Sequence, residues 1–302
     1  MCIRDSSNRA WVYINAGERS FSEPVPYSVG SVPSVVRVVD IEGDGDLDIC
    51  TVNVGSGTIT ILQNDGNGGF GSVRTIATGL AGPAHLAVAD FDLDGSADFA
   101  VASDDNIAIL YGGDFSEREV FAANAGELVV ADLDGDGDTD LGYSILANRR
   151  IAILLNVSGS FFSQPVEFAV DIEAGLLAAA DLDNDNDLDL IPAYERPTRV
   201  PHLWNNDESG ITVASRTRRM APAPHALGMD AGTGDGYLDV ATGDGLGSTI
   251  TIFLNDGAGN LRPGGNRTVQ AGDYLNSIDG GDFDGDGDIC LLYTSPSPRD
   301  RG

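Results

Sequence analysis

The sequence predicts an all-β fold, a β-propeller of four-stranded blades, because two motifs recur along its 302 residues with one shared period. The first motif is an acidic loop of the form Asp-x-Asp-x-Asp-Gly-x-x-Asp. The second is a stretch of alternating apolar residues that ends in Asn. Both return about every 50 residues, and a unit of roughly that length with four strands is a propeller blade.

The acidic loop occurs six times, with 42 to 52 residues between the first residues of successive copies. The copies are Asp40–Asp48, Asp90–Asp98, Asp132–Asp140, Asp181–Asp189, Asp230–Asp239 and a last one that begins at Asp282. The fifth copy has an extra residue and lacks the second acid. The sixth has Cys290 where the closing Asp would stand. We therefore expect about six blades, in a fragment of a larger propeller.

Within a repeat, the period-two alternation and the breaks rich in Gly, Asn and Asp predict four short strands and no helix. In the first complete repeat the predicted strands are Ser34–Val39, Leu47–Asn53, Thr58–Gln63 and Ser72–Thr78. The third strand carries the second motif, which occurs at Ile59–Asn64, Ile151–Asn156 and Ile250–Asn255. The turn that follows holds residues that tolerate positive φ, as a tight hairpin requires.

The charge of the chain excludes several partners. Asp and Glu total 47 against 17 Lys and Arg, a formal net charge of −30, so nucleic acid and anionic membranes would be repelled. No apolar run approaches the roughly 18 residues of a membrane helix. Cys2, Cys50 and Cys290 form neither a paired framework nor a Cys-x-x-Cys metal motif, so we expect no structural disulfide.

The acidic loop has the ligand chemistry of a calcium site. Side chains at positions 1, 3 and 5 of a nine-residue loop can converge on one point, while position 7 offers a backbone carbonyl and position 9 a carboxylate. Ca²⁺ accepts about six to eight such oxygens in loose geometry, whereas Mg²⁺ needs a stricter octahedron. Position 6 must turn sharply, and it is Gly or Asn in every copy: Gly45, Gly95, Gly137, Asn186, Gly236 and Gly287.

We predict about four to five structural Ca²⁺ ions per chain from these loops. The candidate ligands of the four complete loops are Asp40, Glu42, Asp44, Asp46, Asp48, Asp90, Asp92, Asp94, Ser96, Asp98, Asp132, Asp134, Asp136, Asp138, Asp140, Asp181, Asp183, Asp185, Asp187 and Asp189. Those of the two degenerate loops are Asp235, Asp239, Asp282, Asp284, Asp286 and Asp288.

Other interpretations of the acidic loops fit less well. An EF-hand needs Glu at its twelfth loop position, and none of the copies has it. Nonapeptide β-helix repeats return about every nine residues, whereas the acidic loops of this chain return about every 50. The remaining alternative is an ordinary solvated turn. Against it stands the repulsion among carboxylates packed into one turn without a counter-ion, a feature that the chain repeats.

The loops resemble those of the FG-GAP and VCBS repeat proteins, whose blades are similar to those of the integrin α-subunit propeller. The resemblance spans about Trp11 to Asp288. Phe-Gly itself is clear only at Phe70-Gly71, and no repeat has Gly-Ala-Pro after its second strand, which favours the bacterial VCBS-like branch. The resemblance implies that the loop joins the first two strands of a blade and binds calcium. It does not imply integrin-style ligand capture, because the metal-adhesion motif of the integrin inserted domain is missing.

Both ends of the chain look foreign to the repeats. Residues 1–6 and 290–302 resemble translated sequencing-adapter tails, so we assign the propeller to residues 7–289; an ordinary disordered terminus is the alternative. Trp11–Val29 then corresponds to the last two strands of an earlier blade, and residues 276–289 to the start of a later one. The repeats could close as a six-bladed ring or belong to a parent of about seven or eight blades.

No enzyme signature is present: the chain has neither a Gly-x-Ser-x-Gly elbow nor a His-Glu-x-x-His helix. We interpret His85, His202 and His225 as structural, and Asn156–Ser158 and Asn266–Thr268 as glycosylation sequons of little weight. The resemblance implies a secreted or cell-surface adhesion module, not itself an enzyme, whose loops bind a protein or glycan. Extracellular calcium levels would suit modest sites. The alternatives are the propeller part, catalytic or not, of a secreted polysaccharide lyase or hydrolase, and a structural repeat of a giant surface protein.

Overall fold

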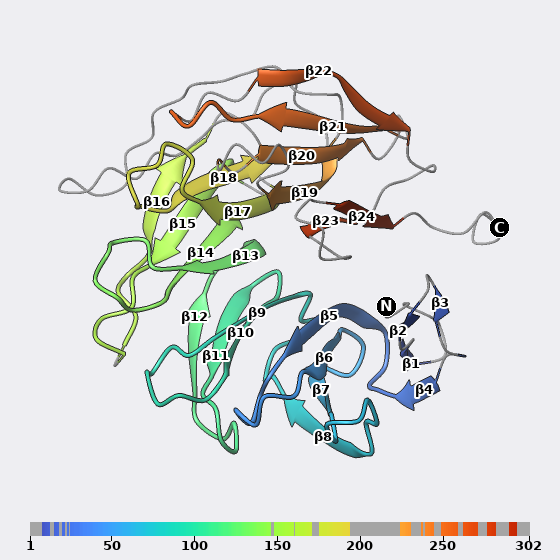
Figure 1. Ribbon diagram of the computed structural model, residues 1–302. Coiled ribbons are helices and arrows are strands. Elements are labelled where there is room, and N and C mark those ends of the chain that lie inside the picture. The colour runs from blue at the N-terminus through green and yellow to red at the C-terminus, as the bar shows by residue number, and fades with distance from the viewer. Residues whose placement is uncertain are drawn as a thin grey trace. The chain divides into compact units, whose positions relative to one another are not determined.

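The described part of the computed structural model is built of β-strands, which confirms the all-β prediction (Figure 1). The structure describes residues 8–12, 15–17, 20–21, 23, 25–145, 148–159, 161–170, 175–193, 224–230, 237, 239–244, 249–258, 262–270, 277–281 and 290–294. The chain divides into two compact units, one of residues 1–130 and 156–162 and one of residues 131–155 and 163–302. Among these described residues, no helix is long and apolar enough to cross a membrane.

Four of the described sheets contain four strands each, in chain order. The first is β5 (Pro33–Val39), β6 (Asp48–Asn53), β7 (Thr58–Gln63) and β8 (Ser72–Ala77). The second is β9 (His85–Ala89), β10 (Asp98–Ala102), β11 (Asn106–Leu110) and β12 (Arg118–Ala122). The third is β13 (Ala125–Ala131), β14 (Asp140–Ile145), β15 (Arg150–Leu154) and β16 (Val166–Ala169). The fourth is β19 (Pro224–Asp230), β20 (Asp239–Asp244), β21 (Thr249–Leu254) and β22 (Arg262–Gln270).

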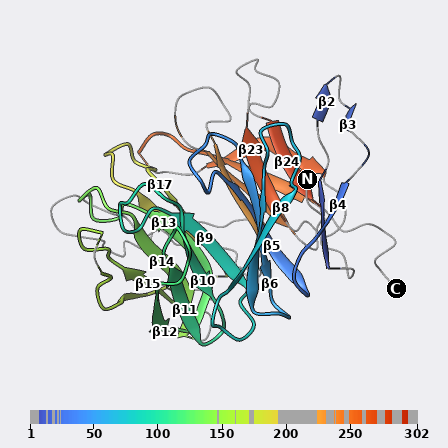
Figure 2. The same ribbon diagram turned by 90° about the horizontal axis from the view of Figure 1, so that it is seen from below.

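The other described strands form pairs. These pairs are β1 (Arg9–Val12) with β4 (Val25–Ser28), β2 (Asn15–Gly17) with β3 (Ser20–Phe21), β17 (Leu176–Ala180) with β18 (Asp189–Ala193), and β23 (Ser277–Gly281) with β24 (Cys290–Thr294). In two views turned by 90°, β9 to β12 lie side by side in one sheet, as the strands of a blade do (Figures 1 and 2).

Each complete acidic loop joins the first two strands of its sheet, and the strand register is the same around the loops at 40–48, 90–98 and 181–189. Val39 pairs with Asp48, so the residue before the loop lies opposite the closing Asp. Ala89 likewise pairs with Asp98, and Ala180 with Asp189. A slip of one residue would turn the closing Asp to the other face of the sheet, so its environment fixes the register.

The fifth loop keeps this arrangement with a shift. Asp230 itself pairs with Asp239, so Asp230 takes the place that Val39 has in the first repeat, not the place of Asp40. The extra residue in the sequence is absorbed in this way. The first acid of the fifth copy is therefore a strand residue in the register of the sheet.

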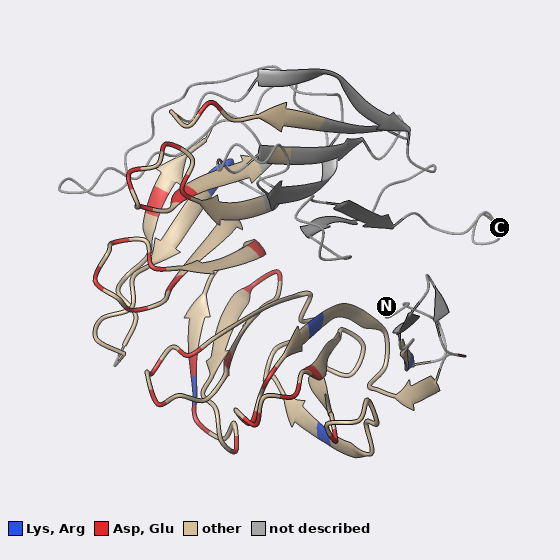
Figure 3. Cartoon of the chain, viewed as in Figure 1, with Lys and Arg blue, Asp and Glu red and all other residues tan. Residues whose placement is uncertain are grey.

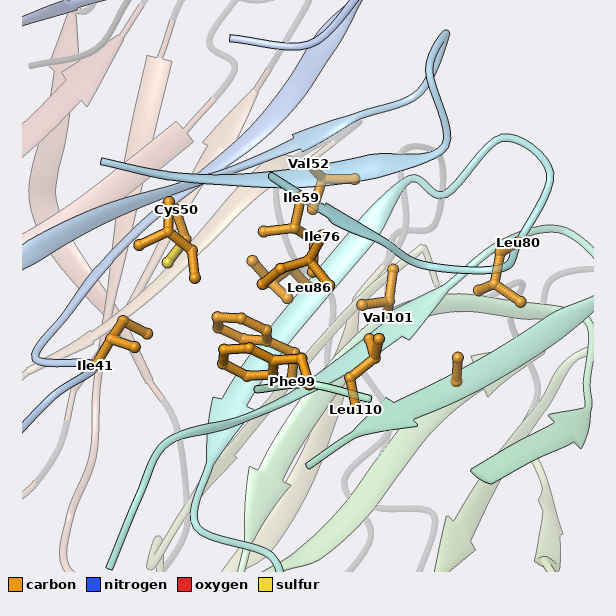
Figure 4. Close-up of a cluster of buried hydrophobic side chains, with 13 residues drawn as sticks. Ile41, Cys50, Val52, Ile59, Ile76, Leu80, Leu86, Phe99, Val101 and Leu110 are labelled. Atoms are coloured by element: carbon orange, nitrogen blue, oxygen red, sulfur yellow. The ribbon is translucent and has the colours of Figure 1, made fainter. Parts of the chain in front are cut away.

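The second strand of the first sheet is buried on both faces, because apolar side chains pack against each face. All six residues of β6 are buried. On one face Cys50 and Val52 share a core with Phe99 of β10 (Figure 4). On the other face Ile49 packs with Val12 of β1. Burial on both faces is the main favourable contribution to folding here, and it explains why inner strands are rich in small aliphatic residues.

The predicted strands of the first repeat are confirmed to within one residue at each end. Thr58–Gln63 is β7, and the other three observed strands begin or end one residue away from the prediction. The segment predicted to be an earlier blade contains the pair β1 and β4, with β2 and β3 between them. Cys290–Thr294, inside the segment predicted to be foreign, forms β24 and pairs with β23. The assignment of the two tails stays a prediction.

Ser144 provides a test of the packing in the third sheet. Its side chain on β14 is fully buried, and its Oγ has no hydrogen-bond partner within the described part of the chain. A buried unpaired hydroxyl costs about 1–3 kcal/mol. We predict that Ser144→Ala raises the free energy of unfolding by about 1 kcal/mol, measured by denaturant titration.

Ser103→Ala is the matched control for this prediction. Ser103 is also buried, but its Oγ donates to the carbonyl of Asn106 at 3.2 Å. The same substitution should therefore lower the free energy of unfolding by about 1 kcal/mol. Equal losses in the two variants would show that Ser144 has a partner after all.

Candidate metal centre

The first carboxylate of each complete loop folds back over the backbone of its own loop. Asp40 accepts hydrogen bonds from the amides of Gly43 and Gly45, both at 2.8 Å. The bond from the amide of position 6 to position 1 recurs in the other three complete loops, at 2.9, 3.0 and 3.1 Å. Position 1 is therefore fixed inside the turn in the same way each time.

Position 5 is held by a second local bond, from the amide of position 7. This bond is 2.7 to 3.0 Å long in the four complete loops. Its donor and acceptor residues are Asp46 and Asp44, Ser96 and Asp94, Asp138 and Asp136, and Asp187 and Asp185. The bond takes one oxygen of the position 5 carboxylate and leaves the other for a further partner.

Positive φ at position 6 makes the turn possible, as the residue types predicted. Its φ lies between 75° and 95° at Gly45, Gly95, Gly137 and Asn186. Position 4 has positive φ as well, at Gly43, Leu93, Gly135 and Asn184. Leu93 is the strained case, because a left-handed conformation costs an ordinary residue about 1–2 kcal/mol. Because one of the four residues at position 4 is a leucine, the residue types there did not predict the positive φ.

The closing Asp of each loop is buried and binds backbone amides. Asp48, Asp98, Asp140 and Asp189 are at most 1% exposed. In each of them Oδ2 accepts a hydrogen bond from the amide of position 2, at 2.7 to 3.1 Å. The other oxygen of Asp48 accepts from the amide of Asn64 at 2.8 Å, and that of Asp98 accepts from Gly112. In these two loops the closing carboxylate thus ties the loop to the end of the third strand.

Three of the complete loops bring three carboxylates together. In each group, one oxygen of every residue lies within 4.8 Å of the others; the groups are Asp90, Asp92 and Asp94; Asp132, Asp134 and Asp136; and Asp181, Asp183 and Asp189. Acidic residues gather on the loops while the strands are largely neutral (Figure 3). Within the described residues, no Lys, Arg or His forms an ion pair with the first two groups.

The first loop does not form such a group among the described residues. Glu42, its position 3, contacts the side-chain amide of Gln63 on β7 instead. Burial, then the hydrogen bond to Asp48, raises the pKa of Glu42 to about 7. A glutamate is longer than the aspartate of the other loops, so its carboxylate reaches across to the third strand.

Burial and mutual repulsion raise the pKa values of the grouped carboxylates. Burial, then the charge of Asp136, raises the pKa of Asp134. Burial, then the charge of Asp185, raises the pKa of Asp183. Burial also raises the pKa of the closing Asp98 to about 6, although the amides of Gly112 and Phe91 oppose the shift. The ionised loops are therefore destabilised unless a cation joins them.

The donor set fits a hard cation. All members of the three groups are carboxylates, and hard divalent ions such as Ca²⁺ prefer oxygen ligands, whereas zinc and softer metals favour His and Cys. In the fourth loop, Asp183 Oδ1 is buried without a hydrogen-bond partner among the described residues. Buried polar atoms almost always have a partner, so a bound cation would supply the one that this oxygen lacks among the described residues.

The degenerate loops lie largely outside the described residues. Asp235 and the run Asp282–Asp288 are not described, and Asp239 is described only as the first residue of β20. Their proposed ligand roles stay predictions. His202 is also outside the described residues, and His225 lies within β19.

His85 takes part in a polar contact away from the acidic loops. Its Nδ1 lies 3.3 Å from Oε2 of Glu127 on β13. Arg37 of β5 lies 3.9 Å from the other oxygen of Glu127. First strands of three successive repeats therefore share this contact, which agrees with a structural role for His85.

Asn156 is a residue whose role the sequence did not reveal. It is buried, and its Nδ2 donates a hydrogen bond to the carbonyl of Phe91 at 2.7 Å. A side-chain nitrogen in this position cannot carry a glycan without breaking that contact. The sequon at Asn156 is therefore not a glycosylation site in the folded chain. Its recurrence at the end of the apolar motif was the only sequence signal for this side chain.

Comparison with protein families gives the repeat type. The model of the FG-GAP-like repeat matches residues 40–101 and 233–292. The first match begins at the first acidic loop and extends into β10; the second begins within the fifth acidic loop and includes the sixth. A comparison with curated proteins found no match.

Several solved structures share the fold at low sequence identity. Virginiamycin B lyase from Staphylococcus aureus has a TM-score of 0.62 at 13% identity, over 95% of this chain and 85% of that one. A lectin of Agrocybe aegerita, described as recognising non-reducing terminal N-acetylglucosamine, has 0.61 at 17%, over 95% and 80%. BBS1N, in complex with ARL6DN, has 0.61 at 14%, over 87% and 75%. These similarities confirm the β-propeller fold.

The raised pKa values predict how the metal-free protein responds to pH. The pKa of Asp98 is about 6 in the folded state against an ordinary value of 3.8, so the folded state binds more protons between these values. Stability in chelator should therefore fall as pH rises from about 4 to 7. Melting temperatures in EDTA across this range test the prediction.

Glu42→Gln is a useful companion to this measurement. It removes a group whose pKa is raised from 4.5 to about 7, so the slope of melting temperature against pH should become shallower. A melting temperature that rises with pH in the metal-free protein would contradict the crowding of ionised carboxylates described above.

Proposed function

We propose that the acidic loops of this β-propeller, whose residues 40–101 and 233–292 match the FG-GAP-like repeat, bind structural Ca²⁺ in an extracellular adhesion or ligand-binding module. The observation that carries the proposal is the set of three carboxylate groups built on one repeated loop backbone. Four loops use the same amide-to-carboxylate bonds, so a local accident of one turn does not account for them.

The chain supplies ligands that would suit Ca²⁺ in particular. In the second and third loops, positions 1, 3 and 5 would hold the ion: Asp90, Asp92 and Asp94, and Asp132, Asp134 and Asp136. In the fourth loop Asp181 and Asp183 would do so together with the closing Asp189. The ion would supply positive charge and oxygen coordination, which offset the repulsion among the carboxylates.

An ion bound in this way would be structural. The loops join the first and second strands, and a cation that binds only the folded loop stabilises the folded state by mass action. The propeller would then present its other loops as a rigid surface. Calcium outside cells is abundant enough to fill modest sites, which supports a secreted or cell-surface location.

A protein or glycan is the proposed ligand of the propeller. Two propellers of similar fold support the two classes: BBS1N is in a complex with ARL6DN, and the lectin of Agrocybe aegerita recognises N-acetylglucosamine. The large negative charge of the chain favours neutral or basic ligands over polyanions.

Calcium binding is tested by thermal unfolding with excess Ca²⁺ and with chelator, together with ion counting by native mass spectrometry. We predict a higher melting temperature with Ca²⁺ and about four to five ions per chain; each site at about one hundred times its Kd contributes roughly 2.7 kcal/mol. The double variant Asp134→Asn, Asp136→Asn should lose one ion and keep the others.

The double variant Asp104→Asn, Asp105→Asn is the matched control. It removes the same two charges from an exposed turn between β10 and β11, outside any acidic loop. Its ion count should equal that of the unmodified protein. Coincident melting curves with and without Ca²⁺, and no retained metal, would overturn the calcium proposal.

Ligand binding is tested on a glycan array and a panel of polysaccharides, with Ca²⁺ and with chelator. We predict retention of particular glycans or of an immobilised protein that is lost in chelator, because the loops order the propeller surface. The same incubations are assayed for new reducing or unsaturated ends. Such ends would show that the propeller belongs to a lyase or hydrolase and would contradict a function in binding alone.

A further inference from the structure

Two buried asparagines reach from one repeat into the acidic loop of the repeat before it. Asn156 follows β15 of the third sheet and is 2% exposed. Its Nδ2 donates to the carbonyl of Phe91 at 2.7 Å. Phe91 is position 2 of the acidic loop between β9 and β10, so the bond joins the third repeat to the loop of the second.

The same contact recurs further along the chain. Asn255 follows β21 and is 5% exposed. Its Nδ2 donates to the carbonyl of Leu182 at 2.9 Å. Leu182 is position 2 of the acidic loop between β17 and β18. Two repeats therefore place the same side chain on the same loop position of the preceding repeat.

Position 2 lies between two proposed ligands, at positions 1 and 3. The amide of Phe91 donates to the closing Asp98 at 2.7 Å, and the amide of Leu182 donates to Asp189 at 3.1 Å. The carbonyl on the other side of each residue is held by the asparagine. Both peptide groups that connect the first two ligands are thus fixed, one by the loop itself and one by the next repeat.

The rest of the hairpin after β15 packs on the same loop. Phe162 meets the ring of Phe91 edge-on, with ring centroids 5.5 Å apart. Gly159 has φ 62°, and a Cβ there would lie 3.0 Å from the carbonyl oxygen of Asp92. Residues 156–162 accordingly belong to the compact unit that contains loop 90–98, not to the unit of their own neighbours in sequence.

The loop of the first repeat provides the contrast. Leu110 pairs with Phe99 as Leu154 pairs with Leu141, so Gly112 stands where Asn156 stands in the third repeat. Glycine has no side-chain amide to offer to the loop at 40–48. That loop is also the complete one whose carboxylates do not gather into a group among the described residues.

We propose that Asn156 and Asn255 are positioning residues for the calcium loops of the preceding repeat. This inference rests on the proposed calcium function. Each asparagine fixes the backbone between ligand positions 1 and 3, so the calcium affinity of loops 90–98 and 181–189 depends on the docking of the next repeat's hairpin. A calcium site is then shared between two repeats, although all its ligands come from one.

The test uses Asn156→Asp in the full chain. The substituted side chain keeps its shape, but its ionised carboxylate cannot donate to the carbonyl of Phe91. Loss of a partner that orients metal ligands typically weakens metal binding about 10- to 100-fold. Native mass spectrometry during a Ca²⁺ titration should show one ion with its Kd raised by about this factor and the other ions unchanged.

A second readout does not depend on metal. In chelator, amide hydrogen exchange of the loop residues 91–95 should be faster in Asn156→Asp than in the unmodified chain. Asn67→Asp is the control, since it makes the same chemical change in an exposed turn, where Nδ2 donates only to Asp65 within the described contacts. It should leave both the exchange of residues 91–95 and every Kd unchanged.

The outcomes separate the two proposals. If the unmodified chain binds no Ca²⁺, the calcium function fails, and with it the role of the asparagines in affinity. If it binds Ca²⁺ and Asn156→Asp binds every ion with unchanged affinity, the positioning role fails and the calcium function stands.

Two further variants keep the test decisive if Asn156→Asp does not fold. Gly159→Ala crowds the carbonyl of Asp92 and should weaken the same site. Asn255→Asp should weaken the site of loop 181–189 and spare that of loop 90–98. Unchanged affinities in both variants would overturn the inference.

Discussion

The buried carboxylate at the end of each acidic loop is the constraint on which the rest of the structure depends. A buried charge is tolerated only where hydrogen bonds satisfy it. Asp98 therefore needs the amide of Phe91 at the start of its loop and that of Gly112 after the third strand. These bonds set the length of the loop, the register of the first two strands and the path of the chain beyond the third. In the loops at 90–98 and 132–140, the carboxylates at positions 1, 3 and 5 gather within a loop that the closing Asp holds in this way.

Much of the fold could be predicted from the sequence because its signals are local. Alternation over Thr58–Gln63 defines a strand by itself, and Gly or Asn at position 6 marks a turn with positive φ. Leu93 could not be predicted, since nothing about a leucine suggests a left-handed conformation. The hydrogen bonds of the neighbouring loop residues impose that conformation, and they outweigh the preference of a leucine for negative φ. The same holds for Asp230, whose place in the sheet depends on pairing with Asp239.

The candidate site could be predicted less completely. Spacing places positions 1, 3 and 5 together, and the loops that begin at Asp90 and Asp132 bear this out. Spacing does not tell which carboxylate oxygens the backbone already uses: both oxygens of the closing Asp98, a candidate ligand by its position, accept hydrogen bonds from amides. Spacing also does not predict that the carboxylate of Glu42 contacts the side chain of Gln63 on the third strand. Contacts of this kind depend on strand register, and the residues that make them are distant in sequence.

The contacts of Asn156 and Asn255 imply that the functional unit of these repeats is a pair of neighbouring repeats and not a single one. A repeat that contributes all the proposed ligands of a calcium site does not by itself hold the backbone of that site, because a side chain of the following repeat also binds it. In repeat architectures each element is stabilised by its neighbours, and elements at the ends differ from those inside. Metal affinity would then vary along the chain with the residue that follows each third strand, even among loops with identical acids. The loops at 40–48 and 90–98 differ in the residue that the next repeat places after its third strand, Gly112 and Asn156, and also in their own position 3, which is Glu42 in one and Asp92 in the other.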